Sequence, residues 1–175
     1  MQCLYAPSLD RDDEIELGGG AGGPVDEVKS ALKRLLNVLD PNCLKFLNSK
    51  GIDATKYIND LLHFDGLIAV KDEPADKKNA IENAHTGSET EGAALTVNGL
   101  GAFFHDSYNG SPITTDRKKI KGGTVEAQEF ILLHEVAHAT EVLAHDKGDQ
   151  KKVDDNDKVL EKECKDTIKA FSKGQ

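Results

Sequence analysis

Tryptophan, methionine and long apolar runs are scarce in this chain of 175 residues. It has no tryptophan, one methionine, three tyrosines and six phenylalanines. No run approaches the roughly 20 apolar residues that a membrane-spanning helix needs, so we expect no such helix. Positive charge is also in deficit, since 31 aspartates and glutamates outnumber 22 lysines and arginines and the net charge is −9. Because nucleic acids and anionic membranes favour a basic surface, neither is an expected partner.

The beginning of the chain lacks the pattern of a secretory signal. The opening stretch, MQCLYAPSLDRDDEIE, contains neither a basic start nor an apolar run. The compartment nevertheless stays open, because the chain can be cytoplasmic or a domain excised from a longer, exported protein.

Cysteine is also rare, and its spacing does not match a metal site. Cys3, Cys43 and Cys164 are far apart in the sequence. We expect reduced, partly buried thiols. The alternative is a bridge between Cys43 and Cys164, which only an exported protein would favour.

Glycine marks the boundary of the folded part. Residues 18–23 read GGGAGG, a composition typical of a flexible linker. Residues 1–23 are therefore predicted to be a tail or linker. Residues 24–175 are predicted to be one domain, which is long enough to bury a hydrophobic core.

Three helices are predicted in the first part of this domain. In PVDEVKSALKRLLNVLD, apolar residues recur at helical spacing, with Pro24 in the first turn and Pro41 closing the helix. CLKFLNSKG predicts a short helix that stops at Gly51. Asp53 is a suitable N-cap for a third helix in DATKYINDLLHF.

A small sheet and two further helices are predicted to follow. GLIAVKDE and ALTVNGLGAFF are typical of strands, the second with a bulge at Gly99 or Gly101 or divided at Asn98-Gly99. Residues 74–92 and 105–123 are predicted to be loops. Thr124 is the expected N-cap of the next helix, and DNDKVLEKECKDTIKAFSK predicts one last amphipathic helix. This order of elements indicates an α+β domain.

The helix after Thr124 carries the strongest chemical signal. Its sequence, EFILLHEVAHATEVLAHD, contains His-Glu-x-x-His, formed by His134, Glu135 and His138. Positions i and i+4 lie on one face of an α-helix, so the two imidazoles can reach one metal ion. The glutamate beside them can act on a metal-bound water.

The bare pattern is only suggestive, because shuffling this composition would produce it in roughly one chain in seventy. Its context strengthens the prediction of a zinc site. The motif lies in a strongly apolar helix, where two histidines and a glutamate would be costly to bury without a partner. A metal ion supplies that partner. The alternative is a hydrogen-bonded pair of core histidines.

The stretch ILLHEVAHAT is similar to the active-site helix of zincin metallopeptidases. That helix has two aliphatic residues before the motif, an aliphatic residue and Gly or Ala within it, and Ala or Ser after it. The order of helices, a small sheet and the motif helix also resembles a compact zincin. More loosely, CLKFL, TVNGLGAFF and HEVAHATEVLAHDKGD resemble small bacterial zincin-like domains of uncharacterised activity.

This resemblance is strong over about 25 residues around the motif. It implies a compact zincin-like fold with a helical N-terminal half, a small β-sheet, the motif helix and a C-terminal helix. It also implies a zinc-dependent peptide hydrolase with one Zn²⁺ ion. His134 and His138 would be metal ligands, and Glu135 would be the general base for a zinc-bound water.

Several residues are candidates for the third metal ligand. The metzincin branch places a third histidine six residues after the second, behind a helix-breaking glycine. Ala144 and Glu141 occupy those two positions here, and His145 lies one residue late. On an unbroken helix His145 would lie about 10 Å further along the axis than His138, too far to reach the same ion. A ligand at His145 or Asp146 therefore requires the helix to end earlier.

The gluzincin branch instead takes its third ligand from a later helix. Glu161 or Glu163 would serve, and Gly148 suits the C-cap of the longer motif helix that this route allows. In the small bacterial domains an acidic residue occupies the position of Asp146. The resemblance therefore ranks Asp146 first, His145 second, and Glu161 or Glu163 third. The predicted metal ligands are His134, His138 and Asp146.

The leading functional hypothesis is a zinc metallopeptidase that acts on a peptide or protein substrate. The alternative is a zinc-stabilised binding or interaction module with weak or no activity, and a helical scaffold without metal is the third possibility. His63, at a helix end, and His85, in a predicted loop, are not expected to bind metal. The oligomeric state is not predicted.

Overall fold

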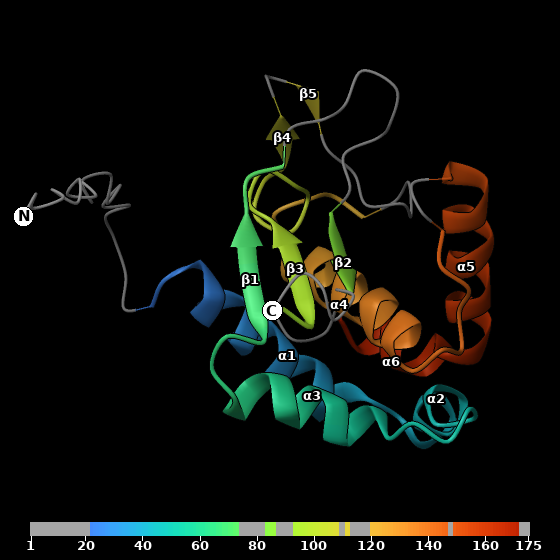
Figure 1. The fold of residues 1–175 in the computed structure, drawn as a ribbon. Coiled ribbons are helices and arrows are strands. Elements are labelled where there is room, and N and C mark those ends of the chain that lie inside the picture. Colours follow the sequence, from blue (N-terminus) through green and yellow to red (C-terminus); the bar gives the residue numbers. More distant parts are fainter. Residues whose placement is uncertain are drawn as a thin grey trace, which may run out of the picture.

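The computed structural model describes residues 22–73, 83–86, 93–108, 111–112, 120–146 and 149–171. Its architecture is mixed α+β, with helices packed against a small three-stranded sheet (Figure 1), which confirms the predicted class. The predicted tail, residues 1–23, lies outside these ranges except for its last two glycines, so its character stays a prediction. Within the described ranges, every helix is too short or too polar to cross a membrane.

The N-terminal half is helical, as predicted, and consists of α1 (Pro24–Val38), α2 (Pro41–Leu47) and α3 (Ala54–His63). Asp53 caps α3, because its side chain accepts a hydrogen bond of 2.9 Å from the backbone N–H of Lys56. Pro41 differs from its prediction, since it begins α2 instead of closing α1. Proline suits the first helical position because the missing N–H would have no partner there.

The sheet has the strand order β1-β3-β2. Strand β1 (Ile68–Lys71) pairs in parallel with β3 (Leu95–Asn98), and β2 (Ala84–Thr86) pairs antiparallel with β3. The prediction of a loop at residues 74–92 is wrong at β2, where backbone pairing with β3 outweighs the polar local sequence. His85 therefore lies on an edge strand, half-buried, and not in a solvated loop.

Strand β3 ends in a turn and does not continue as a second strand. Asn98 fixes this turn, because its Oδ1 accepts hydrogen bonds from the backbone N–H groups of Glu73 and Leu100. A two-stranded hairpin, β4 (Ser107–Tyr108) and β5 (Ser111–Pro112), follows inside the predicted loop 105–123. Most of the remaining predicted loop residues lie outside the described ranges.

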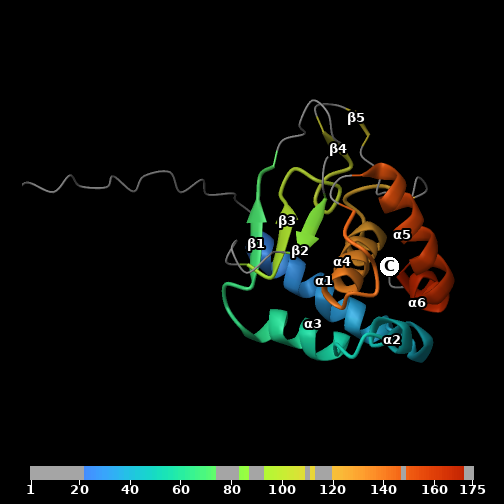
Figure 2. The ribbon, with the colours of Figure 1, turned by 45° about the vertical axis from the view of Figure 1, so that its right-hand side comes forward.

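Helix α4 (Val125–Ala139) carries the histidine motif and packs against both α1 and β2 (Figures 1 and 2). Thr124 is its N-cap as predicted, because its hydroxyl oxygen accepts a hydrogen bond from the Ala127 N–H. Arg34 on α1 donates hydrogen bonds to Glu129 at 3.2 Å and Gln128 at 2.7 Å on α4. Polar contacts therefore fix the beginning of α4 against α1, while apolar packing covers the rest.

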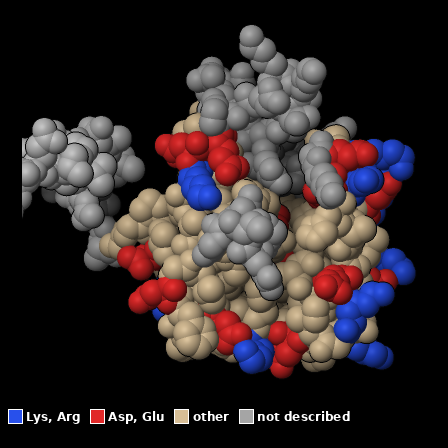
Figure 3. All heavy atoms as spheres, viewed as in Figure 1, with Lys and Arg blue, Asp and Glu red and all other residues tan. Residues whose placement is uncertain are grey.

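Two helices complete the fold, α5 (Gln150–Glu163) and α6 (Lys165–Phe171). The prediction of a single last helix is therefore wrong, because the chain changes direction at Cys164. Figure 3 shows acidic and basic side chains interspersed along the right-hand edge, where α5 lies. Ion pairs of Asp155 with Lys151 and Lys158 belong to this solvated face of α5.

Cys43 and Cys164 form a disulfide that joins α2 to the end of α5. The expectation of reduced thiols is therefore wrong for these two residues, and Cys3 lies outside the described ranges. Beside the disulfide, the backbone N–H and the hydroxyl of Thr167 donate hydrogen bonds to the Asp40 carboxylate. Disulfides persist mainly in proteins exposed to oxidising compartments. The bridge fastens the C-terminal helices to the N-terminal half.

One continuous hydrophobic core joins the helices and the sheet. Its largest fully buried side chains come from all six helices, from β3 and from the turn after it: Phe103, Phe130, Phe171, Leu32, Leu35, Leu47, Ile58, Leu61, Leu95, Leu132, Leu133 and Leu160. Fully burying one such side chain stabilises a fold by roughly 1.5–3 kcal/mol. The motif helix crosses this core, which holds its backbone rigidly.

Candidate metal centre

The polar residues of the motif are buried inside an apolar helix. His134, Glu135 and His138 are only 6%, 7% and 5% exposed. Their neighbours on α4, including Leu133 and Val136, are buried in the core. Polar groups in such surroundings need partners, because an unpaired buried amide or hydroxyl costs roughly 1–3 kcal/mol and a charge costs more.

Helix α4 ends immediately after the motif, at Ala139, and the chain then reverses. Glu141 has a φ of 60°, in the left-handed region. Among the described residues, no other residue except glycine has a positive φ. The backbone N–H of Val142 donates to the carbonyl of Ala137 at 3.1 Å, a bond typical of a helix end that closes through a left-handed residue. Leu143 then returns to the core, only 5% exposed. This reversal rules out the longer motif helix that a C-cap at Gly148 would need.

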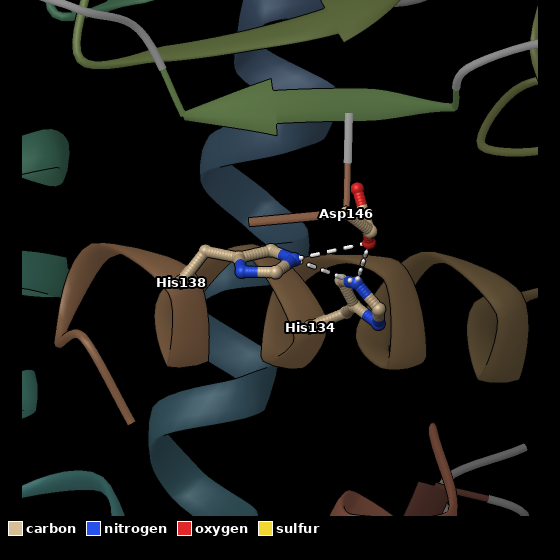
Figure 4. A group of neighbouring side chains, drawn as sticks. All are labelled: His134, His138 and Asp146. Carbon is tan, nitrogen blue, oxygen red and sulfur yellow. Dashed lines mark hydrogen bonds and ion pairs between the residues drawn. The ribbon is translucent and has the colours of Figure 1, made fainter. Parts of the chain in front are cut away.

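The reversal brings Asp146 back to the two histidines. His134 Nε2 and His138 Nε2 are 2.9 Å apart, and Asp146 Oδ2 lies 3.2 Å from the first and 3.3 Å from the second. Figure 4 shows both imidazoles leaving the same side of α4 and the carboxylate reaching them from the returning chain. These three residues could hold a metal ion, because one potential ligand atom from each lies within 4.8 Å of the other two.

Asp157 on α5 holds the other side of the His134 ring. The Nδ1–H of His134 donates to Asp157 Oδ1 at 2.8 Å, and Asp157 is 4% exposed. With a proton held on Nδ1, loss of the Nε2 proton would leave a neutral imidazole whose Nε2 lone pair is available to a metal ion. Histidines that bind metal commonly donate their other N–H to a carboxylate in this way, which supports a metal at the centre.

Sequence reasoning missed Asp157, although a signal was present. Asp157, Leu160 and Cys164 are buried along α5 with spacings of three and four residues, so they lie on one helix face. An acidic residue on an otherwise apolar stripe requires a buried partner, which is His134. Beside it, the Asn156 side chain donates to the carbonyl of Ala144 at 3.0 Å. Two adjacent residues of α5 therefore hold both the motif helix and the segment that carries Asp146.

The electrostatics of the cluster favour a cation. Burial alone lowers the pKa of His134, but hydrogen bonds to Asp146 and Asp157 and the charges of Glu135 and Asp157 raise it to about 10. Burial raises the pKa of Asp146, yet hydrogen bonds from His134 and His138 outweigh this effect and leave the pKa far below its usual range. The carboxylates of Asp146, Asp157 and Glu135 thus all stabilise positive charge on His134. Asp146 also contacts His138.

Glu135 lies next to this cluster on α4 and is almost fully buried. The pKa of the Tyr57 phenol on α3 is raised, mainly by burial and to a smaller extent by the negative charge of Glu135. The Tyr57 hydroxyl donates to the carbonyl of Ala94 at 3.2 Å, just before β3. The charge of the general-base candidate therefore acts both on His134 in the cluster and on Tyr57 of α3.

The other candidate ligands do not join the cluster. Glu161 and Glu163 lie on α5, and Glu163 forms an ion pair with Lys162 at 2.8 Å. His145 is exposed, and its ring stacks on His138 with ring centroids 5.5 Å apart and planes inclined by 11°. His63 contacts the Asn59 carbonyl at the end of α3. Among the described residues, the converging group is His134, His138 and Asp146.

Comparison of the chain with family models, with curated proteins and with solved structures found no match. The resemblance to zincins therefore rests on the sequence around the motif alone. Membership of that family stays a prediction.

Proposed function

We propose that this protein is a zinc-dependent hydrolase of peptide bonds. The observation that carries the proposal is the convergence of two imidazole nitrogens and one carboxylate oxygen from His134, His138 and Asp146. Catalytic zinc sites commonly use three protein ligands and keep a fourth position for water or substrate, whereas structural sites are usually closed by four protein ligands. Three converging side chains match the catalytic pattern.

The donor set favours zinc over the hard divalent cations. Zinc binds imidazole nitrogen and carboxylate oxygen, whereas calcium and magnesium prefer oxygen ligands throughout. Two histidines and a carboxylate also bind ferrous iron in oxygenases. Glu135 favours hydrolysis over oxygen chemistry, because a buried carboxylate next to the first ligand is the arrangement of a general base.

A bound zinc ion would supply Lewis acidity, which polarises a carbonyl and favours deprotonation of water. Glu135 would accept the proton of the attacking water on its carboxylate and later donate it to the departing amine. Asp157 would keep the proton on Nδ1 of His134 and so hold the ring in its ligand orientation. Strand β2, at the edge of the sheet and packed against α4, would bind the peptide as an added strand.

Burial of the cluster supports a second candidate function. His134 and His138 are each at least 94% buried, and the Asp146 side chain is 16% exposed. A centre that is this deeply buried also suits a structural metal ion, which would stabilise the fold of a binding module without taking part in catalysis. The two candidates share the metal site and differ in whether Glu135 acts on a substrate.

The test compares zinc-loaded wild type with Glu135→Gln on a broad peptide library. The glutamine keeps the shape of the side chain but cannot accept the proton, so kcat/KM should fall by about a hundredfold or more while zinc content is unchanged. Glu126→Gln, the same change in the first turn of α4, is the matched control and should keep wild-type activity. A zinc-loaded wild type that cleaves no peptide would favour the binding module. Full activity of Glu135→Gln would remove Glu135 from the mechanism.

A further inference from the structure

The two histidines of the centre are held by different means. His134 has a hydrogen bond on each side, from Nδ1 to Asp157 and at Nε2 within the cluster. His138 Nδ1, in contrast, is buried and has no hydrogen-bond partner among the described residues. The described hydrogen bonds of His138 are all at Nε2, to His134 at 2.9 Å and to Asp146 at 3.3 Å, so none supports the Nδ1 side of its ring.

The ring of His138 is also in contact with two neighbouring rings. The His134 ring lies beside it at a steep angle, with centroids 4.7 Å apart and planes inclined by 66°. His145 lies nearly parallel to it, with centroids 5.5 Å apart and planes inclined by 11°. This offset, near-parallel geometry is one of the two arrangements that aromatic rings favour.

The exposed fractions of the two residues show that the His145 ring covers the His138 ring from solvent. His138 is 5% exposed, whereas His145 is an exposed residue on the returning segment next to Asp146. The reversal at Glu141 places this imidazole over His138 at the same time as it delivers Asp146 to the cluster. One turn thus supplies both a potential ligand and a cover for another ligand.

We propose that His145 is a positioning residue, which orients the His138 ring for metal binding through ring stacking and does not itself bind the metal. The inference rests on the proposed metal site but not on peptide hydrolysis. Metal binding should require an aromatic ring at position 145 but should not require a ring nitrogen there. His145→Phe keeps the ring and removes the nitrogens, whereas His145→Ala removes both.

The test measures zinc affinity by competition with a chromophoric chelator at one pH, for wild type, His145→Ala, His145→Phe and the control His63→Ala. The dissociation constant of His145→Ala should rise by about 10-fold, within the 10- to 100-fold range of residues that orient metal ligands. His145→Phe and His63→Ala should stay within about threefold of wild type on the same scale. The visible spectrum of the cobalt-loaded protein should be the same for His145→Phe and wild type.

If His145→Phe loses zinc as severely as His145→Ala and its cobalt spectrum changes, His145 is a ligand and the inference is wrong. Wild-type affinity in His145→Ala would also overturn it. Thermal unfolding of the metal-free variants checks the fold, and His145→Leu, which lacks an aromatic face, replaces an alanine variant that unfolds. A wild type that binds metal but cleaves nothing would overturn only the hydrolase proposal, and one that binds no metal would overturn both.

Discussion

Replacing Asp157 should weaken metal binding although this residue is not one of the proposed ligands. Its Oδ1 accepts a 2.8 Å hydrogen bond from His134 Nδ1 in a site where both side chains are almost fully buried. Asp157→Leu removes this acceptor and leaves Nδ1 without its partner. The His134 ring then loses its fixed orientation and part of its basicity, so its Nε2 becomes a poorer ligand.

The magnitude follows from the burial and charge of this contact. Loss of such a supporting carboxylate weakens metal affinity about 10- to 100-fold, or about 1.4–2.7 kcal/mol. The hydrogen bond is buried and its acceptor is ionised, so we expect Asp157→Leu near the upper end of that range. Asp157→Asn keeps an oxygen acceptor without the charge, and should fall between wild type and the leucine variant.

Asp155→Asn is the matched control on the same helix. Asp155 is exposed and pairs with Lys151 and Lys158, so the substitution makes the same charge change without touching the cluster. Zinc dissociation constants are compared by chelator competition in one buffer at one pH. The reasoning is refuted if Asp157→Leu binds zinc within about twofold of the control, far less than a lost supporting carboxylate should cost.

Two further predictions concern the helix end and the protons of the site. Glu141→Gly should raise the free energy of unfolding, measured with denaturant, by up to about 1 kcal/mol, because glycine adopts a left-handed φ without strain. Glu141→Val should lower the free energy of unfolding and weaken zinc binding. A valine variant more stable than wild type would contradict the strained turn. At pH 7 metal-free His134 keeps its extra proton, since its pKa is about 10, so zinc must displace that proton and zinc affinity should rise with pH from 6 to 8. Calorimetry in two buffers of different ionisation enthalpy should show release of about one proton per zinc, whereas uptake of protons or no release would contradict this state of His134.

The motif helix was predictable because its determinants are local. The i, i+4 spacing of His134 and His138 places both rings on one face of any α-helix, whatever the rest of the fold. Thr124 and Asp53 were identified as N-caps for the same reason, since a cap depends on backbone groups two or three residues away. The structure contains all of these features.

The position of Asp146 depends on a conformation that its sequence does not reveal. Glutamate is a poor residue for a left-handed helix end, so the stretch from Glu141 to Ala144 contains no recognisable helix breaker. The helix nevertheless ends at Ala139, because Leu143 is buried in the core and the backbone of Val142 bonds to Ala137. Tertiary packing therefore outweighs local preference at this turn.

The remaining surprises are contacts between distant parts of the chain. Strand β2 lies in a polar stretch and exists through its pairing with β3. Asp157 becomes part of the centre only because α5 packs beside α4, 23 residues after His134 in the sequence. The Cys43–Cys164 bridge spans 121 residues, and cysteine spacing alone does not predict such a pairing.

Metal analysis of the purified protein tests the central claim most directly. Elemental analysis after removal of loosely bound ions should find about one zinc per chain in wild type and in His63→Ala. It should find almost none in His134→Ala or His138→Ala, because each of these two variants lacks one of the three proposed ligands. Iron in place of zinc would contradict the hydrolase. A wild type without metal, or equal zinc in all four proteins, would contradict the metal centre itself.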